Sequence, residues 1–296
     1  MKGGNITRAI KEDRIKKDFM KIVTRALKED LGSGDITTDS IIDDKERALG
    51  VVFPKGDGIL CGVDIAKTVF KEVDPRIEFE PKMNDGDILN PGTTIATVIG
   101  LAASCLKAER TALNFLQHLS GIATLTRKFV DATEGKIKIL DTRKTTPGLR
   151  SMEKYAVRTG GGSNHRFGLY DMVLIKDNHI QIAGSITNAV NAVQSRKKRV
   201  FIEVEVKTID ELKEILLLKV HRVMLDNMRP EQIKQAVETL HNNNKKIETE
   251  ISGGINLGNI GDYVDCGADY VSIGAITHSA PAVDIALKMK SLGRAE

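Results

Sequence analysis

Tryptophan is absent from the sequence, and phenylalanine and tyrosine together make up 4% of its 296 residues. Proteins that hold unpaired bases usually stack them on aromatic side chains, so this scarcity argues against a nucleic-acid partner. Cysteine is also rare, and the three cysteines are Cys61, Cys105 and Cys266. They are far apart and form no Cys-x-x-Cys pair, which argues against a disulfide framework or a structural zinc site and favours a reducing compartment.

Long apolar runs are missing as well. No stretch of the sequence approaches the ~20 apolar residues that a membrane-spanning helix needs. The first 21 residues are charged throughout and lack the apolar centre of a secretory signal peptide. With 41% hydrophobic residues, the chain nevertheless has an ordinary globular composition. We therefore expect a soluble cytoplasmic protein without a membrane partner.

A large excess of one charge is also absent, because 44 basic residues face 40 acidic ones. The small excess is concentrated in residues 141–176, which contain seven basic and three acidic residues. A local basic cluster on a nearly neutral chain is typical of a site for a small anion. Chance placement on a solvated face remains an equal alternative at this point.

The first part of the chain predicts helices separated by short strands and turns. One helix is expected from residue 15 to near Leu31, where Gly32 follows, and another over 63–73 among strands and turns within 47–99. A long helical pattern then covers 101–119. We place a domain boundary at its end, with residues 1–120 in the first domain and 121–296 in the second.

A repeated strand–helix rhythm begins after residue 135. The expected strands are 137–141, 172–176, 200–206, 222–226, 247–251 and 269–273. The expected helices are 184–195, 208–218, 229–241 and 281–290. Short apolar strands that alternate with helices predict a parallel sheet, because parallel strands need crossover connections.

Polar residues stand at or just after the end of nearly every one of these strands. In chain order they are Arg143 and Lys144, Lys176, Glu205, Asp226, Ser252-Gly253-Gly254, and Gly274-Ala275. An α/β barrel presents its functional groups in this way, whereas a doubly wound sheet gathers them at one switch point. The pattern therefore favours a barrel, with six or seven strands.

The small residues after the last two strands could bind a phosphate through backbone N–H groups. Barrels commonly hold phosphate at their final two strand–helix loops. The alternative is that these glycines only make tight turns. Glu205 and Asp226 end strands that should be neighbours, and such hard oxygen ligands suit Mg²⁺. Ion pairing with the basic cluster is the equal alternative. His165, next to Arg166, could donate a hydrogen bond to an anion.

Ten short motifs occur along the chain in a fixed order. They are residues 29–38 (EDLGSGDITT), 109–111 (ERT), 119–124 (LSGIAT), 141–150 (DTRKTTPGLR), 164–169 (NHRFGL), 174–179 (LIKDNH), 203–205 (EVE), 225–227 (LDN), 252–254 (SGG) and 277–279 (THS). With these motifs the chain resembles the quinolinate phosphoribosyltransferase family, from roughly residue 20 to 290. No motif position departs from the family pattern.

The resemblance implies a fold and a reaction. The fold is an N-terminal α/β sandwich followed by a partial α/β barrel, and a C-terminal helix over 281–296 can pack on the first domain. The reaction joins quinolinate and phosphoribosyl pyrophosphate to give nicotinate mononucleotide, pyrophosphate and CO₂ in NAD biosynthesis, with Mg²⁺. The resemblance further implies a homodimer, or a larger assembly such as a hexamer, in which Arg110 enters the neighbouring subunit's site.

The same resemblance assigns roles to single residues. The substrate-binding residues are Arg110, Thr142, Arg143, Lys144, His165, Arg166, Lys176, Glu205, Asp226, Ser252, Gly253, Gly254, Ile273, Gly274 and Ala275. Lys144, Glu205 and Asp226 are the expected catalytic residues, and the last two are the expected Mg²⁺ ligands. Arg110 is predicted by the resemblance alone, because an arginine on a helix usually lies on a solvated face.

Three other interpretations stay open. Lys176 at a strand end, among other cations, could form an imine in a Schiff-base aldolase. A non-catalytic phosphate-binding protein would also have the glycine turns, but it would not need Glu205. A molybdenum-associated relative of the same family is the third, and the complete set of cationic residues argues against it.

Overall fold

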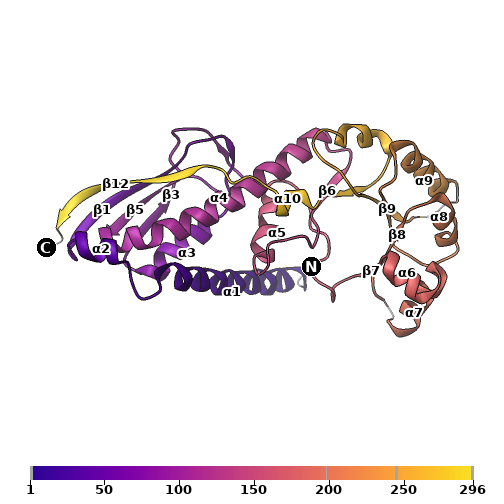
Figure 1. Ribbon diagram of the computed structural model, residues 1–296, viewed down its shortest axis with the longest axis horizontal. Coiled ribbons are helices and arrows are strands. Elements are labelled where there is room, and N and C mark those ends of the chain that lie inside the picture. Colours follow the sequence, from indigo (N-terminus) through magenta and orange to yellow (C-terminus); the bar gives the residue numbers. More distant parts are fainter. Residues whose placement is uncertain (1–2, 198, 244–245, 295–296) are drawn as a thin grey trace. The chain divides into compact units, whose positions relative to one another are not determined.

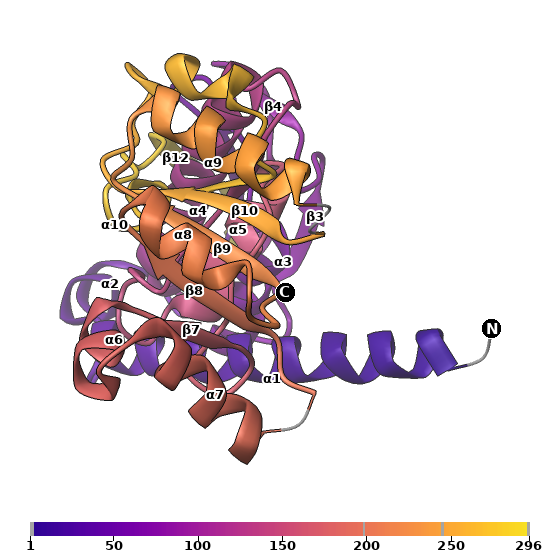
Figure 2. The same ribbon diagram turned by 90° about the vertical axis from the view of Figure 1, so that its right-hand side faces the viewer.

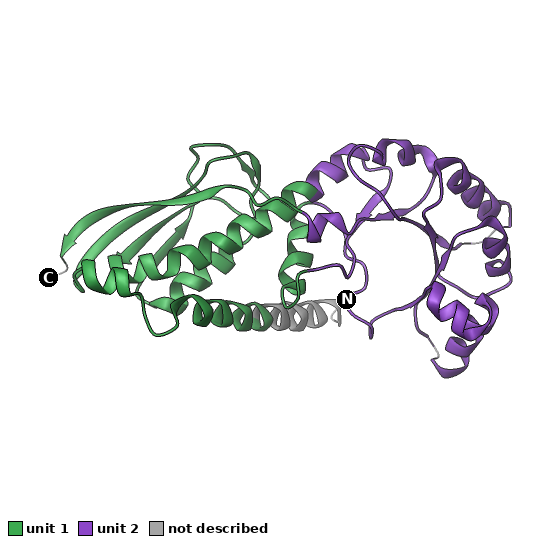
Figure 3. Ribbon diagram, viewed as in Figure 1, with its two compact units in different colours: residues 1–125, 146–160, 280–296 green, residues 126–145, 161–279 purple. Residues whose placement is uncertain are grey.

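The computed structural model describes residues 3–197, 199–243 and 246–294. The chain forms two compact units (Figure 3). Unit 1 comprises residues 1–125, 146–160 and 280–296, and unit 2 comprises residues 126–145 and 161–279. The division therefore falls at residues 125/126 within a long helix, five residues beyond the expected domain boundary, and unit 1 also takes in two later segments.

Unit 1 contains a four-stranded antiparallel sheet. Its strands are β1 (Glu46–Pro54), β3 (Glu78–Pro81), β5 (Ala96–Leu101) and β12 (Ile285–Arg294), in the order β12-β1-β5-β3. Burial alternates along β1 and β5, as expected for a sheet that packs on one face. Two short strands, β2 (Gly58–Ile59) and β4 (Ile88–Leu89), form a separate antiparallel pair.

Five helices belong wholly or partly to unit 1. They are α1 (Gly3–Leu31), α2 (Ile36–Ile41), α3 (Val63–Val73), α4 (Ala102–Ala132) and α5 (Arg150–Thr159). Helices α3 and α4 lie along one face of the sheet (Figure 1). The prediction for α3 is confirmed, as is the end of α1 at Leu31. Helix α4 continues beyond the expected end at residue 119, because Ile122, Ala123 and Phe129 prolong its buried stripe.

The helix expected over residues 281–290, and with it a C-terminal helix over 281–296, is wrong. These residues contain strand β12, which pairs with β1 along its whole length. The apolar residues Ile285, Leu287 and Met289 alternate with more polar neighbours, so their period is two rather than 3.6. Leu287 lies over Gly50 of β1, where an added Cβ would come within 2.8 Å of its Cδ1 atom.

Unit 2 contains the six expected strands as one parallel sheet. They are β6 (Lys138–Leu140), β7 (Val173–Ile175), β8 (Ile202–Val206), β9 (Arg222–Asp226), β10 (Glu248–Ser252) and β11 (Tyr270–Ser272). Their order is β6-β11-β10-β9-β8-β7, so the first strand lies beside the last. Within the described residues no strand pairing joins β6 to β7, and the sheet is a partial barrel. The predicted fold class is confirmed.

Helices cover the outer side of this curved sheet (Figures 1 and 2). They are α6 (Asp177–Ala183), α7 (Ile186–Arg196), α8 (Ile209–Ile215), α9 (Pro230–Asn242), the 3₁₀ helix η1 (Ile260–Cys266) and α10 (Ala275–His278). Helices α7, α8 and α9 confirm three of the four expected helices. None of the helices in the described part of the chain is both long and apolar enough to cross a membrane.

Candidate active site

The carboxyl ends of the six parallel strands meet at one edge of unit 2. The predicted residues at this edge are Thr142, Arg143 and Lys144 after β6, Lys176 after β7, Glu205 in β8, Asp226 in β9, Ser252, Gly253 and Gly254 at the end of β10, and Ile273, Gly274 and Ala275 after β11. A bridge between Leu140 and Ser163 brings His165 and Arg166 to the end of β6. The structure thus gathers every predicted residue of unit 2 at one end of the sheet. Arg110 is exposed on α4 in unit 1.

Lys176 and Glu205 form an ion pair at this edge. The distance from Lys176 Nζ to Glu205 Oε2 is 2.7 Å, and the exposed fractions of the two side chains are 44% and 7%. The lysine therefore faces solvent while the carboxylate lies deeper. The lysine amine is held by a carboxylate rather than presented alone to a carbonyl substrate, so the geometry does not favour the aldolase interpretation.

Glu205 and Asp226 lie on neighbouring strands and face the same side of the sheet. Glu205 pairs in register with Met224, and Asp226 follows Met224 by two residues. Asn227 donates a hydrogen bond to Asp226 Oδ2 at 2.9 Å. Two carboxylates on one face are the hard oxygen ligands that Mg²⁺ prefers, so this pair fits a magnesium site. Nearby, Asp177 is the main cause of a raised pKa for Lys207, to which the charges of Glu205 and Asp226 also contribute.

The glycine turn after β10 has a local structural reason. Gly253 has φ +98°, and an added Cβ would lie 2.2 Å from Asn227 Oδ1. The Asn227 N–H donates to the carbonyl oxygen of Ser252 at 2.8 Å, so the ends of β9 and β10 are tied together. A side chain at position 253 would push Asn227 away from Asp226.

The turn after β11 contacts the loop after β6 directly. An added Cβ at Gly274 would lie 2.8 Å from Lys144 Cδ. The Thr277 hydroxyl donates to the carbonyl oxygen of Lys144 at 2.8 Å, and the Lys144 N–H donates to the Thr142 hydroxyl at 2.9 Å. The small residue at 274 therefore lets Lys144 lie across the turn that was predicted to bind phosphate.

A buried polar cluster lies among the strands that carry these residues. His165 Nε2 is 3.0 Å from Glu203 Oε2 and 3.4 Å from Glu250 Oε2. Arg222 contacts Glu250 at 3.2 Å and Glu248 at 2.7 Å. We call His165, Glu203, Glu250 and Arg222 the buried cluster.

Burial and the neighbouring charges have opposite effects on the pKa values of Glu203 and His165. Burial raises the pKa of Glu203 to about 7, although His165 acts in the opposite direction. Burial also lowers the pKa of His165, but its hydrogen bonds to Glu203 and Glu250 outweigh that effect and raise it to about 9. The Arg166 N–H opposes a second ring proton, because it donates to His165 Nδ1 at 2.8 Å. Nε2 is the ring nitrogen that faces the two carboxylates.

His165, Glu203 and Glu250 could also offer one ligand atom each to a metal ion, within 4.8 Å of one another. Two observations favour a proton over a dication here. His165 is hydrogen-bonded directly to Glu203, and the Arg222 guanidinium already contacts Glu250 Oε2, the same oxygen that faces His165. The pair of Glu205 and Asp226 is the better metal site.

The sequence analysis included Asp141 and Glu203 in motifs but gave them no role, and it missed Glu250 and Arg222. Asp141 accepts the His165 N–H at 2.8 Å and the Asn164 side-chain amide at 2.6 Å. A signal for the strand residues was present, because two glutamates stand two positions apart in β8 and again in β10, where an apolar core is usual. Residues with this spacing face one side of the sheet.

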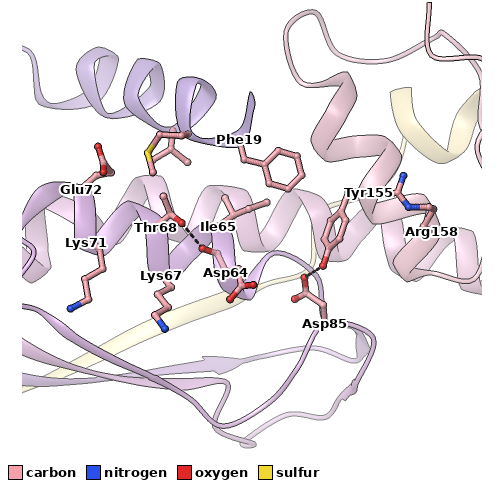
Figure 4. A pocket seen from close by; sticks show the side chains of 12 residues that line it. Phe19, Asp64, Ile65, Lys67, Thr68, Lys71, Glu72, Asp85, Tyr155 and Arg158 are labelled. Atoms are coloured by element: carbon pink, nitrogen blue, oxygen red, sulfur yellow. Dashed lines mark hydrogen bonds between the residues drawn. The ribbon is translucent and has the colours of Figure 1, made fainter. Parts of the chain in front are cut away.

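A cavity of about 650 Å³ lies entirely within unit 1 and contains none of the predicted residues. It is lined by α1, α3, α5 and the Asp85 loop (Figure 4). Tyr155 donates to Asp85 Oδ2 at 2.6 Å, and Asp85 Oδ1 accepts the N–H groups of Gly62 and Val63. The Asp85 carboxylate thus serves to fix the start of α3.

Comparison with known proteins gives consistent matches over most of the chain. Residues 35–120 match the model for the quinolinate phosphoribosyl transferase N-terminal domain, and residues 122–288 match the model for the C-terminal domain. A probable nicotinate-nucleotide pyrophosphorylase (carboxylating) of Bacillus subtilis (strain 168) is 43% identical over 269 residues, which is 90% of this chain and 92% of the relative.

Two further relatives agree. Quinolinate phosphoribosyltransferase (decarboxylating) 1b of Nicotiana tabacum is 41% identical and covers 92% of this chain, with 82% of the relative covered. The crystal structure of NadC from Streptococcus pyogenes superposes with a TM-score of 0.88 at 41% identity, over 92% of this chain and 96% of that one.

Proposed function

Because the chain belongs to the quinolinate phosphoribosyltransferase family, we propose that the strand ends of unit 2 form its active site for phosphoribosyl transfer to quinolinate. The chain is a nicotinate-nucleotide pyrophosphorylase (carboxylating), a pentosyltransferase of NAD biosynthesis. The second substrate is phosphoribosyl pyrophosphate. The observation that carries the site assignment is the convergence of cations and of two carboxylates at one edge of the barrel.

The cations bind the dicarboxylate. Arg143, Arg166 and Lys176 hold the two carboxylates of quinolinate, with His165 behind Arg166. The planar guanidinium suits this task, because it can donate two parallel hydrogen bonds to one carboxylate. When quinolinate binds, the Lys176 ammonium is shared between Glu205 and a substrate carboxylate.

The opposite side of the site binds the sugar substrate. The backbone N–H groups of the turns 252–254 and 273–275 hold the 5-phosphate, and Lys144 neutralises phosphate charge from its position across the second turn. Glu205 and Asp226 face the ribose and would hold Mg²⁺. Mg²⁺ would supply positive charge to the pyrophosphate and so make it a better leaving group.

Bond formation then depends on positioning and charge. The quinolinate nitrogen forms a bond to the anomeric carbon while the bond from that carbon to the pyrophosphate oxygen breaks. The new pyridinium accepts the electron pair of the adjacent ring–carboxylate bond, CO₂ leaves, and a proton from solvent takes its place. No covalent protein nucleophile is needed, and the acceleration comes from orientation and electrostatic stabilisation.

The assembly and location are part of the same proposal. The enzyme is a homodimer, or a larger assembly of dimers, in which Arg110 reaches the partner's substrate; its exposure on α4 is compatible with that role. Its three cysteines are free and buried, which suits the reducing cytoplasm.

A product assay tests the function. Purified protein with quinolinate, phosphoribosyl pyrophosphate and Mg²⁺ is expected to release nicotinate mononucleotide and CO₂ in equal amounts. Nicotinate is the control substrate, because it has one carboxylate, and it should give no product. Turnover of nicotinate alone would contradict the assignment. In the same assay, Asp226→Ala should abolish activity or raise the Mg²⁺ requirement, and an unchanged Mg²⁺ profile would remove Asp226 from the metal site.

A further inference from the structure

The buried cluster lowers the stability of the folded protein. The side chains of Glu203 and Glu250 are fully buried, and one oxygen of each, Oε1, has no hydrogen-bond partner among the described residues. Burying a carboxylate that is incompletely paired costs stability, and an apolar residue of similar size would avoid the cost. The arrangement therefore calls for a reason other than core packing.

Strand register explains how the cluster is assembled. Glu203 on β8 pairs with Arg222 on β9, and Arg222 pairs in turn with Glu248 on β10. Glu250 follows Glu248 by two residues and so lies one step nearer the carboxyl ends of the strands. The side chains of Glu203 and Glu250 converge on a single atom, His165 Nε2, at 3.0 and 3.4 Å.

His165 connects this cluster to the substrate site. Its side chain is 6% exposed, and its Nε2 atom faces the two carboxylates. On its other side, Nδ1 accepts the backbone N–H of Arg166 at 2.8 Å. The His165 backbone N–H is held by Asp141 at 2.8 Å. The imidazole thus lies between the buried carboxylates and the backbone of Arg166.

The charge of the Arg166 guanidinium also depends on its neighbours. Burial lowers the pKa of Arg166, as does the nearby Arg143, while Glu203 favours the charged guanidinium. The Arg166 side chain also donates to the carbonyl oxygen of Met172 at 3.3 Å. The backbone of Arg166 is therefore held by His165, and the charge of its guanidinium is favoured by Glu203.

We propose that Glu203 and Glu250 are positioning residues. They hold His165 through its Nε2 atom, and His165 in turn holds Arg166 in the position that binds the carboxylates of quinolinate. The proposal rests on the proposed role of Arg166 in quinolinate binding. It assigns His165 to support rather than to direct donation of its Nε2 proton to the substrate. The expected consequence is selective: affinity for quinolinate depends on these two buried carboxylates, and affinity for phosphoribosyl pyrophosphate does not.

The test compares Glu203→Gln and Glu250→Gln with Glu248→Gln. Glu248 is the matched control, because it lies on the same strand as Glu250 and binds the same Arg222 but does not contact His165. Both test variants should raise the KM for quinolinate about tenfold, since a small misplacement of a binding group is costly. Their KM for phosphoribosyl pyrophosphate and their kcat should stay within about twofold, and the control should be unaffected.

Other outcomes overturn the proposal. Unchanged quinolinate KM in both test variants does so, and so does an equal loss in all three variants for both substrates, which would indicate general destabilisation. Arg166→Lys distinguishes the proposed role of Arg166 in quinolinate binding from the positioning role of Glu203 and Glu250. If it leaves the quinolinate KM unchanged, the proposed role of Arg166 fails; if it raises the KM while the glutamine variants do not, only the positioning role fails.

A measurement on the unaltered protein keeps the proposal testable if the variants fold poorly. Long-range ¹H–¹⁵N correlations of histidine-labelled protein report which ring nitrogen of His165 carries a proton, with His165→Asn for assignment. A proton on Nε2 that exchanges slowly and is unaffected by saturating quinolinate supports the proposal. A direct shift of the Nε2 signal on quinolinate binding, larger than that of Nδ1, contradicts it.

Discussion

At the scale of single residues, Asp74 illustrates how a loop carboxylate controls stability in acid. It accepts hydrogen bonds from the Arg76 backbone and guanidinium at 2.9–3.0 Å and from the Ser104 hydroxyl at 3.0 Å. The Arg76 side chain is the main cause that lowers the pKa of Asp74 from 3.8 to about 2. Its carboxylate therefore stabilises the folded state above pH 3.8, and this contribution is lost as the pH falls toward 2.

Asp74→Asn removes this contribution. Because Arg76 is exposed and solvent screens the pair, we expect the free energy of unfolding to fall by about 1–2 kcal/mol at pH 7. The difference from the unaltered protein should shrink below pH 4 and disappear near pH 2. Urea unfolding at several pH values measures it. A difference that is constant across this range would show that Asp74 stabilises through packing rather than charge.

Single residues also show which part of the site could be predicted from the sequence. Lys176, Glu205 and Asp226 could be found from the sequence because each stands at or next to the end of an apolar strand, and strand ends are recognisable. Glu250 and Arg222 could not be interpreted in the same way. They lie inside strands, where their partners belong to other strands and depend on register.

At the scale of secondary-structure elements, β12 is the instructive case. Ile285 at its start is 1% exposed, whereas Leu292 near its end is 52% exposed. Ile285→Ala should lower the free energy of unfolding by about 2–4 kcal/mol, because it leaves a cavity in the core of unit 1. Leu292→Ala is the control on the same strand and should change it by less than about 0.5 kcal/mol.

The measurement is urea unfolding of both variants beside the unaltered protein. Similar losses for Ile285→Ala and Leu292→Ala would contradict the burial that β12 has in this structure. The error over residues 281–290 arose because a short amphipathic segment satisfies both periods within a few residues. Pairing with β1, more than 230 residues earlier, decides between them, and that partner is invisible to any local pattern.

At the scale of the whole molecule, the shared-site proposal makes a prediction about mixed assemblies. Arg110→Ala and Lys144→Ala should each be inactive alone, because each removes one half of every site. When the two are unfolded together and reassembled, a mixed dimer contains one site with both residues intact. Activity should return to about a quarter of the unaltered level, since random pairing makes half of the dimers mixed and each has one complete site.

Isotope-edited mass spectrometry of the reassembled sample verifies that mixed dimers are present. Mixed dimers without activity would place Arg110 outside the partner's site. Reassembly of each variant with itself is the control and should recover none. A monomeric protein with full turnover would remove the shared site altogether.

The amino-acid sequence by itself determined the family, the reaction and the parallel sheet of unit 2, because motifs and strand periodicity are local properties of the chain. It also located the strand ends and, with them, most candidate site residues. Tertiary structure alone decided three things: the pairing of β12 with β1, the contact of Lys144 with the turn at Gly274, and the convergence of Glu203 and Glu250 on His165. Each joins residues far apart in the chain, and long-range packing and register determine such contacts.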